Sequence, residues 1–208
     1  NNVEVYDVND KNITNTLGSF FKGKKELLNP LIESGKKNYA WKFLLALGYS
    51  DWVSFVDPQI TRLDLDDLSL GKLSDKISQL GNLFVLNVEK NNLKSLPENI
   101  GSLKNLTNIS LTNNSIRNFP ESFGNLKNLQ ELMISHNDLT LLPQQIRKLP
   151  NLKRLYLTGN ENLKNLYKQL KGFPNLKNLE FLTVKNMGIS EKEIGQIKTL
   201  FPKINVMF

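Results

Sequence analysis

The chain carries few of the residues that perform catalysis. Its 208 residues include one histidine, His136, and no cysteine, so a thiol nucleophile or a pair of histidines cannot be assembled. The remaining option is a pair of carboxylates, Asp64 and Glu89, used as in glycoside hydrolases. We expect these two residues on neighbouring strands of an open surface, without a pocket to enclose a substrate. No G-x-S-x-G elbow, P-loop or dinucleotide fingerprint occurs, so the sequence predicts that the chain is not an enzyme.

Four acidic residues close together in the chain are the candidate ligands for a cation: Asp64, Asp66, Asp67 and Glu89. Calcium prefers about six or more oxygen ligands, held in a loop with turn glycines. Neighbouring strands do not supply such a cage. His136 has no carboxylate or second histidine beside it in the sequence pattern, so a solvated side chain is the simpler interpretation. We therefore expect no metal and no cofactor.

The formal net charge of +7 is concentrated in one stretch of the chain. Between residues 147 and 177, eight basic residues stand against the single acid Glu161, and eight minus one gives a local excess of +7. We call these residues the basic patch: Arg147, Lys148, Lys153, Arg154, Lys164, Lys168, Lys171 and Lys177. Nucleic acid is not the expected partner, because the chain has no recognition-helix motif and no aromatic stacking platform. An acidic membrane surface or an anionic glycan stays an alternative partner.

A repeating unit must position these residues. Six segments share one leucine spacing: ITRLDLDDLSL, LFVLNVEKNNL, LTNISLTNNSI, LQELMISHNDL, LKRLYLTGNEN and LEFLTVKNMGI, starting at Ile60, Leu83, Leu106, Leu129, Leu152 and Leu179. The starts are 23 residues apart four times and then 27 apart. The alternating leucines predict a short strand with one buried side, and stacked copies predict a parallel sheet. Pro97, Pro120 and Pro143 follow in the second half of three copies, which predicts extended or 3₁₀-like backbone there.

The pattern L-x-x-L-x-L-x-x-N-x-L resembles the leucine-rich repeat family, in the 23-residue class common in bacterial and plant proteins. Asn91, Asn114, Asn137 and Asn160 occupy its asparagine position. An amide there can donate to, and accept from, backbone groups of the turn and of the adjacent copy. The resemblance implies an α/β fold, a leucine-rich repeat solenoid with a curved parallel β-sheet of about six repeats. It also implies a bacterial protein that binds another protein on the concave face of the sheet.

Both ends of the chain depart from the repeat and are predicted to cap it. Residues 1–59 contain apolar residues at helical spacings, so we expect a helical N-terminal cap there. The repeats occupy residues 60–189. Residues 190–208 are predicted to form a helix-plus-strand C-terminal cap, because Ser190 and Glu193 match a capping box and the last residues alternate between apolar and polar.

Outward-facing side chains of successive strands are expected to form columns across the concave face. Early repeats place acidic and polar residues in these columns, and late repeats place large and basic residues there, which is typical of interaction hot spots. Met133 and Tyr156 could instead simply cover surface, since exposed apolar side chains are common. The predicted partner-binding residues are Asp64, Asn87, Met133, Arg154, Tyr156, Phe181 and Lys185.

The sequence thus predicts a monomeric, non-catalytic module that binds a protein partner, whose identity the scaffold does not specify. The alternative is a protein that binds an anionic polymer, glycan, nucleic acid or membrane surface through the basic patch. No segment is long and apolar enough for integral membrane insertion. The chain begins at Asn1 without a methionine, which fits removal of a signal peptide or a chosen boundary. We therefore expect a secreted or cell-envelope protein, with a cytoplasmic location as the alternative.

Overall fold

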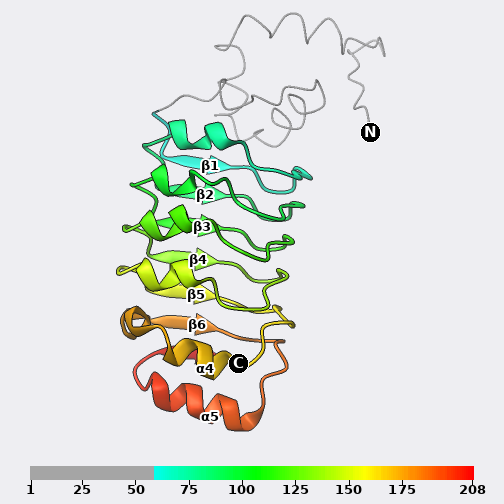
Figure 1. Cartoon of the computed structure of the whole chain (residues 1–208), viewed down its shortest axis with the longest axis vertical. Helices are drawn as coiled ribbons and strands as arrows, with labels where there is room; N and C mark the ends of the chain where they lie inside the picture. The colour runs from blue at the N-terminus through cyan, green and yellow to red at the C-terminus, as the bar shows by residue number, and fades with distance from the viewer. Residues whose placement is uncertain (1–58) are drawn as a thin grey trace, which may run out of the picture.

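The computed structural model describes residues 59–208, and their backbone is organised around seven short parallel strands. The strands are β1 (Arg62–Asp64), β2 (Val85–Asn87), β3 (Asn108–Ser110), β4 (Glu131–Met133), β5 (Arg154–Tyr156), β6 (Phe181–Thr183) and β7 (Asn205–Met207). They pair in chain order in one open, curved sheet, stacked along the long axis of the molecule (Figure 1). The predicted α/β solenoid with a parallel sheet is confirmed.

The register of the sheet follows the repeat length. Arg62 of β1 pairs with Val85 of β2, which stands 23 residues later, and Arg154 of β5 pairs with Phe181 of β6 across the 27-residue step. The longer step contains α4 (Leu166–Lys171), which buries Leu166 and Leu170 outside the sheet. The extra residues therefore leave the strand register unchanged.

The second half of most repeats returns as a short 3₁₀ helix on the side of the core opposite the strands. These are η3 (Asp75–Gln79), η4 (Ile100–Ser102), η5 (Glu121–Asn125), η6 (Gln144–Lys148) and η7 (Pro174–Asn178). Pro120 and Pro143 directly precede η5 and η6, where a residue without an N–H does not interrupt hydrogen bonding. The 3₁₀-like return predicted from the prolines is confirmed.

Leucines from the strands and from the returns form one continuous core. The middle residue of each inner strand is fully buried, as Leu86, Ile109 and Leu132 show, and Ile100 and Ile146 on the return side are also fully buried. Each repeat contributes one layer of this core and is covered by its neighbours. The fold is therefore stabilised mainly between repeats rather than within them.

A ladder of asparagine side chains joins successive repeats at the turn after each strand. Asn114 donates from Nδ2 to the carbonyls of Val88 and Leu111, each at 3.0 Å, and its Oδ1 accepts from the Leu93 N–H at 3.0 Å. Asn91, Asn137 and Asn160 bond in the same way to the repeat before their own. The predicted role of these residues in satisfying buried backbone groups is confirmed.

The C-terminal residues form α5 (Glu191–Leu200) and the edge strand β7. Ser190 caps the helix by accepting from the Glu193 N–H, as the capping box predicted. Ile197 and Phe201 are buried against the last repeat. The predicted N-terminal helical cap lies outside the described residues, apart from Gln59, so it stays a prediction together with the proposed domain boundaries.

Candidate functional site

The predicted partner-binding residues lie on one side of the sheet. In each inner strand the middle residue is buried in the core while its two neighbours project to the opposite side, which we call the open face. The strand register stacks the projecting residues in columns. The column of third strand residues contains Asp64, Asn87, Met133 and Tyr156. The column of first strand residues contains Arg154 and Phe181, and Lys185 follows two residues after β6.

The early end of the open face is less acidic than its sequence indicates. Arg62 donates two hydrogen bonds to the Asp64 carboxylate on the same strand, from Nε at 2.9 Å and from Nη2 at 3.0 Å. This pair is bidentate, the geometry in which arginine and carboxylate bind most strongly. Asn87 accepts the Glu89 N–H at 3.1 Å. Asp64 and Asn87 therefore have partners within the chain already.

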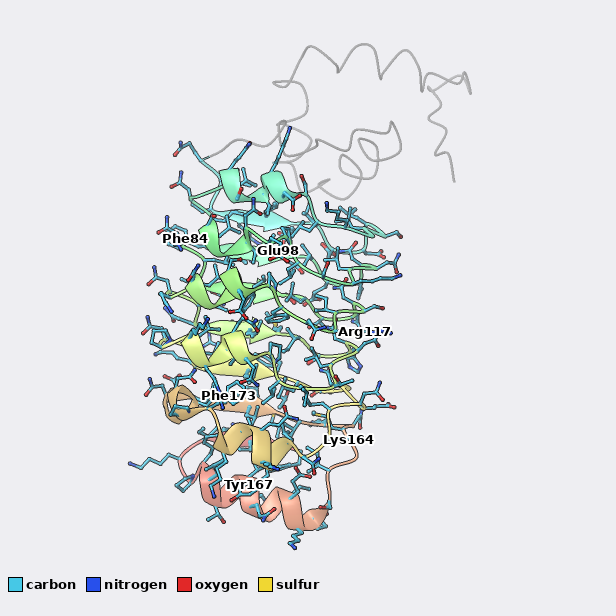
Figure 2. All side chains as sticks on the ribbon, in the orientation of Figure 1. Phe84, Glu98, Arg117, Lys164, Tyr167 and Phe173 are labelled. Carbon is cyan, nitrogen blue, oxygen red and sulfur yellow. The ribbon has the colours of Figure 1, made fainter. Side chains whose placement is uncertain are left out.

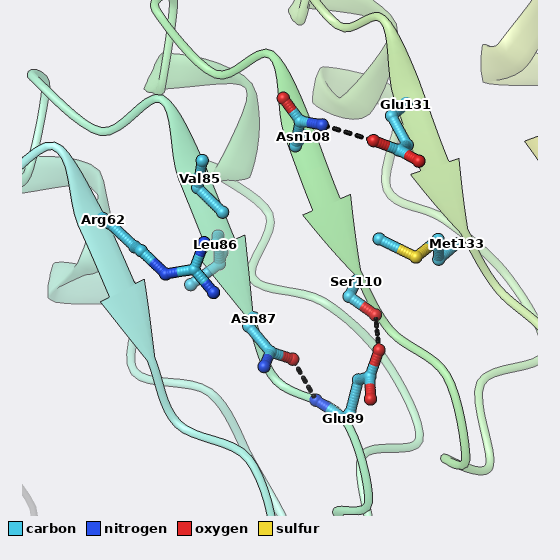
Figure 3. Close-up of a pocket in the computed structure, with 9 residues that line it drawn as sticks. All are labelled: Arg62, Val85, Leu86, Asn87, Glu89, Asn108, Ser110, Glu131 and Met133. Atoms are coloured by element: carbon cyan, nitrogen blue, oxygen red, sulfur yellow. Dashed lines mark hydrogen bonds between the residues drawn. The ribbon is translucent and has the colours of Figure 1, made fainter. Parts of the chain in front are cut away.

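A hollow of about 330 Å³ opens on this face across β1 to β4. It is lined by Arg62, Val85, Leu86, Asn87, Glu89, Asn108, Ser110, Glu131 and Met133, which Figure 3 shows converging from four strands. The expectation that this surface has no pocket was wrong, because small residues such as Ser110 alternate with long ones. Glu89, which accepts from the Ser110 hydroxyl, reaches into the hollow, whereas Asp64 is not among its lining residues.

Glu131 is the centre of the polar contacts on the open face. Its carboxylate accepts from Arg154, with N–O distances of 3.2 Å, and from the Asn108 amide. Burial raises the pKa of Glu131, but hydrogen bonds from Arg154 and Tyr156 outweigh it, so the pKa lies below its ordinary value. Burial and the same carboxylate raise the pKa of Tyr156. Glu131 is therefore ionised at neutral pH and unsuited to the role of general acid.

Two aromatic rings lie beside this polar centre. Tyr156 on β5 and Phe181 on β6 are half-buried, with ring centroids 5.3 Å apart and planes tilted by 51°. Met133, the neighbour of Tyr156 in its column, is half-buried as well. Tilted ring pairs at this distance attract each other, so the rings hold each other in place. The structure thus brings together Met133, Arg154, Tyr156 and Phe181, four of the predicted binding residues.

Acids from outside residues 147–177 partly neutralise the basic patch. Three of its cations pair with glutamates of neighbouring repeats, at N–O distances of 3.0 to 3.2 Å: Lys148 with Glu121, Lys153 with Glu180, and Arg154 with Glu131. The count along the chain missed these acids because they are distant in sequence. The patch also spreads over several surfaces, since Arg154 lies on the open face and Lys164 lies at the edge opposite Phe84 (Figure 2).

A column of left-handed residues next to the open face escaped the sequence analysis. The residue before each ladder position has a positive φ between 50° and 73°: Asp67, Lys90, Asn113, His136, Gly159 and Asn186. Aspartate, asparagine, histidine and glycine tolerate this conformation better than other residues, so their recurrence in this column could have predicted the positive φ. The His136 ring lies directly over Gly159, where a Cβ would come within 2.3 Å of Nδ1.

Residues 59–208 contain no cluster of three or more histidine, aspartate and glutamate side chains able to hold a metal ion. Within the same residues, no helix combines the length and the apolar character needed to cross a bilayer. The contacts that dominate the open face are instead hydrogen bonds, ion pairs and ring contacts at a partly exposed surface.

A family model described as leucine rich repeat matches residues 104–161. That segment contains β3, β4 and β5. Equivalent repeat positions are paired in the same way between the strands outside it, such as β1 with β2 and β5 with β6. Residues 104–161 therefore match the leucine-rich repeat family, and the described strands share its fold. No curated protein matches it.

Solved structures of leucine-rich repeat proteins resemble this one. The plant peptide hormone receptor RGFR1, determined in complex with RGF2, is 28% identical, with a TM-score of 0.54 over 73% of this chain and 25% of the receptor. An internalin, inlF, from Listeria monocytogenes is 18% identical, with a TM-score of 0.53 over 65% of this chain and 37% of that one. The APL1 leucine-rich repeat domain is 21% identical, with a TM-score of 0.55 over 65% and 35%. This chain thus spans 25% to 37% of the length of these proteins.

Proposed function

We propose that the chain is a non-catalytic protein-interaction module that binds its partner on the concave, open face of the repeat sheet. The observation that carries the proposal is the cluster of Met133, Arg154, Tyr156 and Phe181, which stands half-exposed on that face. The leucine-rich repeat scaffold requires none of these residue types at outward positions. The similar plant structure is that of a peptide hormone receptor, which supports a polypeptide ligand.

The energetics of the cluster favour a protein partner. Large aromatic side chains and arginine supply most of the binding free energy at protein interfaces. Here the Tyr156 and Phe181 rings contact each other, and Glu131 fixes both Arg154 and Tyr156. A partner would therefore meet side chains that are already ordered, so little conformational entropy remains to be lost on binding.

The alternative function, binding of an anionic polymer through the basic patch, has weaker support. Three of the patch cations are neutralised by glutamates, and Lys164 Nζ donates to the Glu161 carbonyl at 2.6 Å. Lys168 and Lys171 on α4 stay exposed. They supply exposed surface charge, which accelerates association with an acidic partner more than it strengthens the complex.

The test first captures binding partners from the native cells with the wild-type chain. It then compares the affinity of two sets of variants for those partners. Tyr156→Ala with Phe181→Ala is expected to leave the fold intact, because both side chains project outward, and to weaken binding by about 2 kcal/mol or more, roughly 30-fold. Neutralising Lys164, Lys168 and Lys171 is expected to change mainly the association rate and its salt dependence.

A control is Leu141→Ala, since Leu141 is 63% exposed and lies outside the strands of the sheet. This variant also removes exposed apolar surface and should bind normally. Loss of affinity in the lysine variant, with normal binding by the aromatic variant, would reject the concave-face proposal in favour of the anionic partner. We further propose a secreted or cell-envelope monomer, which gel filtration and fractionation of the native cells would test.

A further inference from the structure

One column of the open face carries opposite charges at its two ends. It consists of the residues two positions after each strand: Asp66, Glu89, Thr112, Ser135, Thr158 and Lys185. We call it the seventh-position column, after its place in the repeat. Two carboxylates stand at the early end, one lysine stands at the late end, and three small hydroxyl residues separate them.

Hydrogen bonds fix the register of this column beyond the strands. The Lys90 N–H donates to the Thr112 carbonyl at 3.0 Å, and the Gly159 N–H donates to the Lys185 carbonyl at 2.9 Å. Equivalent bonds link the intervening repeats, from Asn113 to Ser135 and from His136 to Thr158. The backbone ladder therefore continues through the column, and its members are neighbours at the strand spacing of about 4.8 Å.

The charged ends of the column lack oppositely charged partners within the described residues. Asp66 and Lys185 make no ion pair there, and the Glu89 carboxylate accepts only the hydrogen bond from the Ser110 hydroxyl. By contrast, the charged side chains on the strands themselves are paired, Arg62 with Asp64 and Arg154 with Glu131. Among the described strand residues and this column, the charges without an ion pair are thus acidic after β1 and β2 and basic after β6.

The middle of the column is a polar floor of small side chains. Thr112, Ser135 and Thr158 are half-buried. The Thr158 hydroxyl donates to the Thr183 hydroxyl at 3.0 Å, while those of Thr112 and Ser135 have no hydrogen-bond partner among residues 59–208. A hydroxyl can both donate and accept, so this floor can bond to the N–H and C=O groups of an extended backbone. Its small side chains allow that backbone to approach closely.

We propose that the seventh-position column binds an extended polypeptide segment with a lysine or arginine at one end and an acidic side chain at the other. Glu89 and Lys185 are four strand spacings apart, about 19 Å. An extended chain advances about 3.3 Å per residue, so the two charges of the segment stand about six residues apart. The cationic side chain enters the hollow lined by Glu89, the acidic one meets Lys185, and an intervening apolar side chain contacts Tyr156. This assignment rests on the proposed function and specifies the chemistry of its partner.

The test uses blocked, fluorescently labelled peptides of about seven residues, so that the two terminal charges stand about six residues apart, with mixed uncharged interiors. Binding is measured by anisotropy on the full chain. Peptides with lysine and aspartate at opposite ends are expected to bind at least about fivefold more tightly than peptides with lysine at both ends or with the two charges adjacent. Lys185→Glu should abolish this preference. Lys185→Glu combined with Asp66→Lys and Glu89→Lys should restore it, because the peptide can then bind in the reverse direction.

A preference that survives Lys185→Glu, or that the triple reversal fails to restore, would overturn the assignment. The variant Lys192→Glu on α5 is the matched control, since it makes the same charge change on an exposed residue outside the open face and should have no effect. Failure of the column is distinguishable from failure of the proposed function. If Tyr156→Ala weakens binding but the charge reversals do not change the peptide preference, only the column is refuted. If the charge reversals change the preference but Tyr156→Ala leaves the affinity unchanged, the aromatic site is refuted.

Discussion

Gly101 and Gly124 occupy the same position in successive repeats, yet they differ in what surrounds them. A Cβ added at Gly101 would lie 1.9 Å from the backbone oxygen of Ser122 in the next repeat. A Cβ added at Gly124 would lie 2.7 Å from Cδ of Lys148, whose side chain is half-exposed and can move aside. We therefore expect Gly101→Ala to destabilise the fold far more than Gly124→Ala does.

The magnitude follows from two opposing effects. Relieving the contact at Gly101 requires η4 and η5 to separate by about 1 Å, and overpacking of this kind costs about 1–3 kcal/mol. Replacing glycine also lowers the conformational entropy of the unfolded chain, which stabilises the fold by about 0.4–1 kcal/mol. The central values of these ranges give a net loss of about 1.3 kcal/mol for Gly101→Ala. Gly124→Ala should fall within about 0.5 kcal/mol of the wild type, since it displaces the exposed Lys148 side chain and its surface ion pair.

Urea unfolding followed by circular dichroism measures both variants. With a slope of about 2 kcal/mol per molar, Gly101→Ala should lower the midpoint by about 0.6–0.7 M, while Gly124→Ala should change it much less. Equal midpoints for the two alanine variants would show that the repeats separate at little cost, and the argument from backbone contact would then be wrong.

Three further outcomes are expected. Asn114→Ala should reduce the free energy of unfolding by about 1–3 kcal/mol in urea titrations, because it leaves buried backbone groups unpaired, whereas Asn118→Ala on the exposed surface should change it by less than about 0.5 kcal/mol. Glu131→Gln should be less stable than the wild type at pH 7. That difference should shrink as the pH falls below about 4.3, because a lowered pKa makes the stabilisation present above the unfolded-state pKa and lost as pH falls through the folded-state pKa. Deleting residues 1–59 should cause aggregation on gel filtration if they cap the first repeat; a monomeric product with unchanged melting would make them a separate appendage.

The repeat pattern was sufficient to predict most of the fold. A spacing of 23 residues forces equivalent leucines into adjacent layers, so the strand register and the asparagine ladder follow from the sequence alone. The 27-residue step was visible in the spacing, but the pattern did not reveal that α4 forms within it.

The candidate site was predictable in position but not in its interactions. The columns of the open face follow from the repeat, so Tyr156 and Phe181 could be placed near each other. The role of Glu131 could not be predicted, because it depends on side-chain rotamers that bring Arg154 and Asn108 to one carboxylate. The hollow beside it was missed for the same reason: its shape depends on which long side chains bend away.

The asparagine ladder stops one junction before the end of the solenoid. Met187 stands where an asparagine would bond to the fifth repeat, and the Leu163 N–H donates instead to Asn160 of its own repeat. The last repeat, with α5 and β7, is thus attached by strand pairing, side-chain packing and polar contacts such as the Lys153–Glu180 ion pair, but without a buried asparagine bridging the junction. In hydrogen exchange we expect this unit to open at a lower free energy than the four junctions before it. A ligand that contacts both Tyr156 and Lys185 would bridge the junction, so binding on the open face should slow exchange in the last repeat even where the ligand makes no contact.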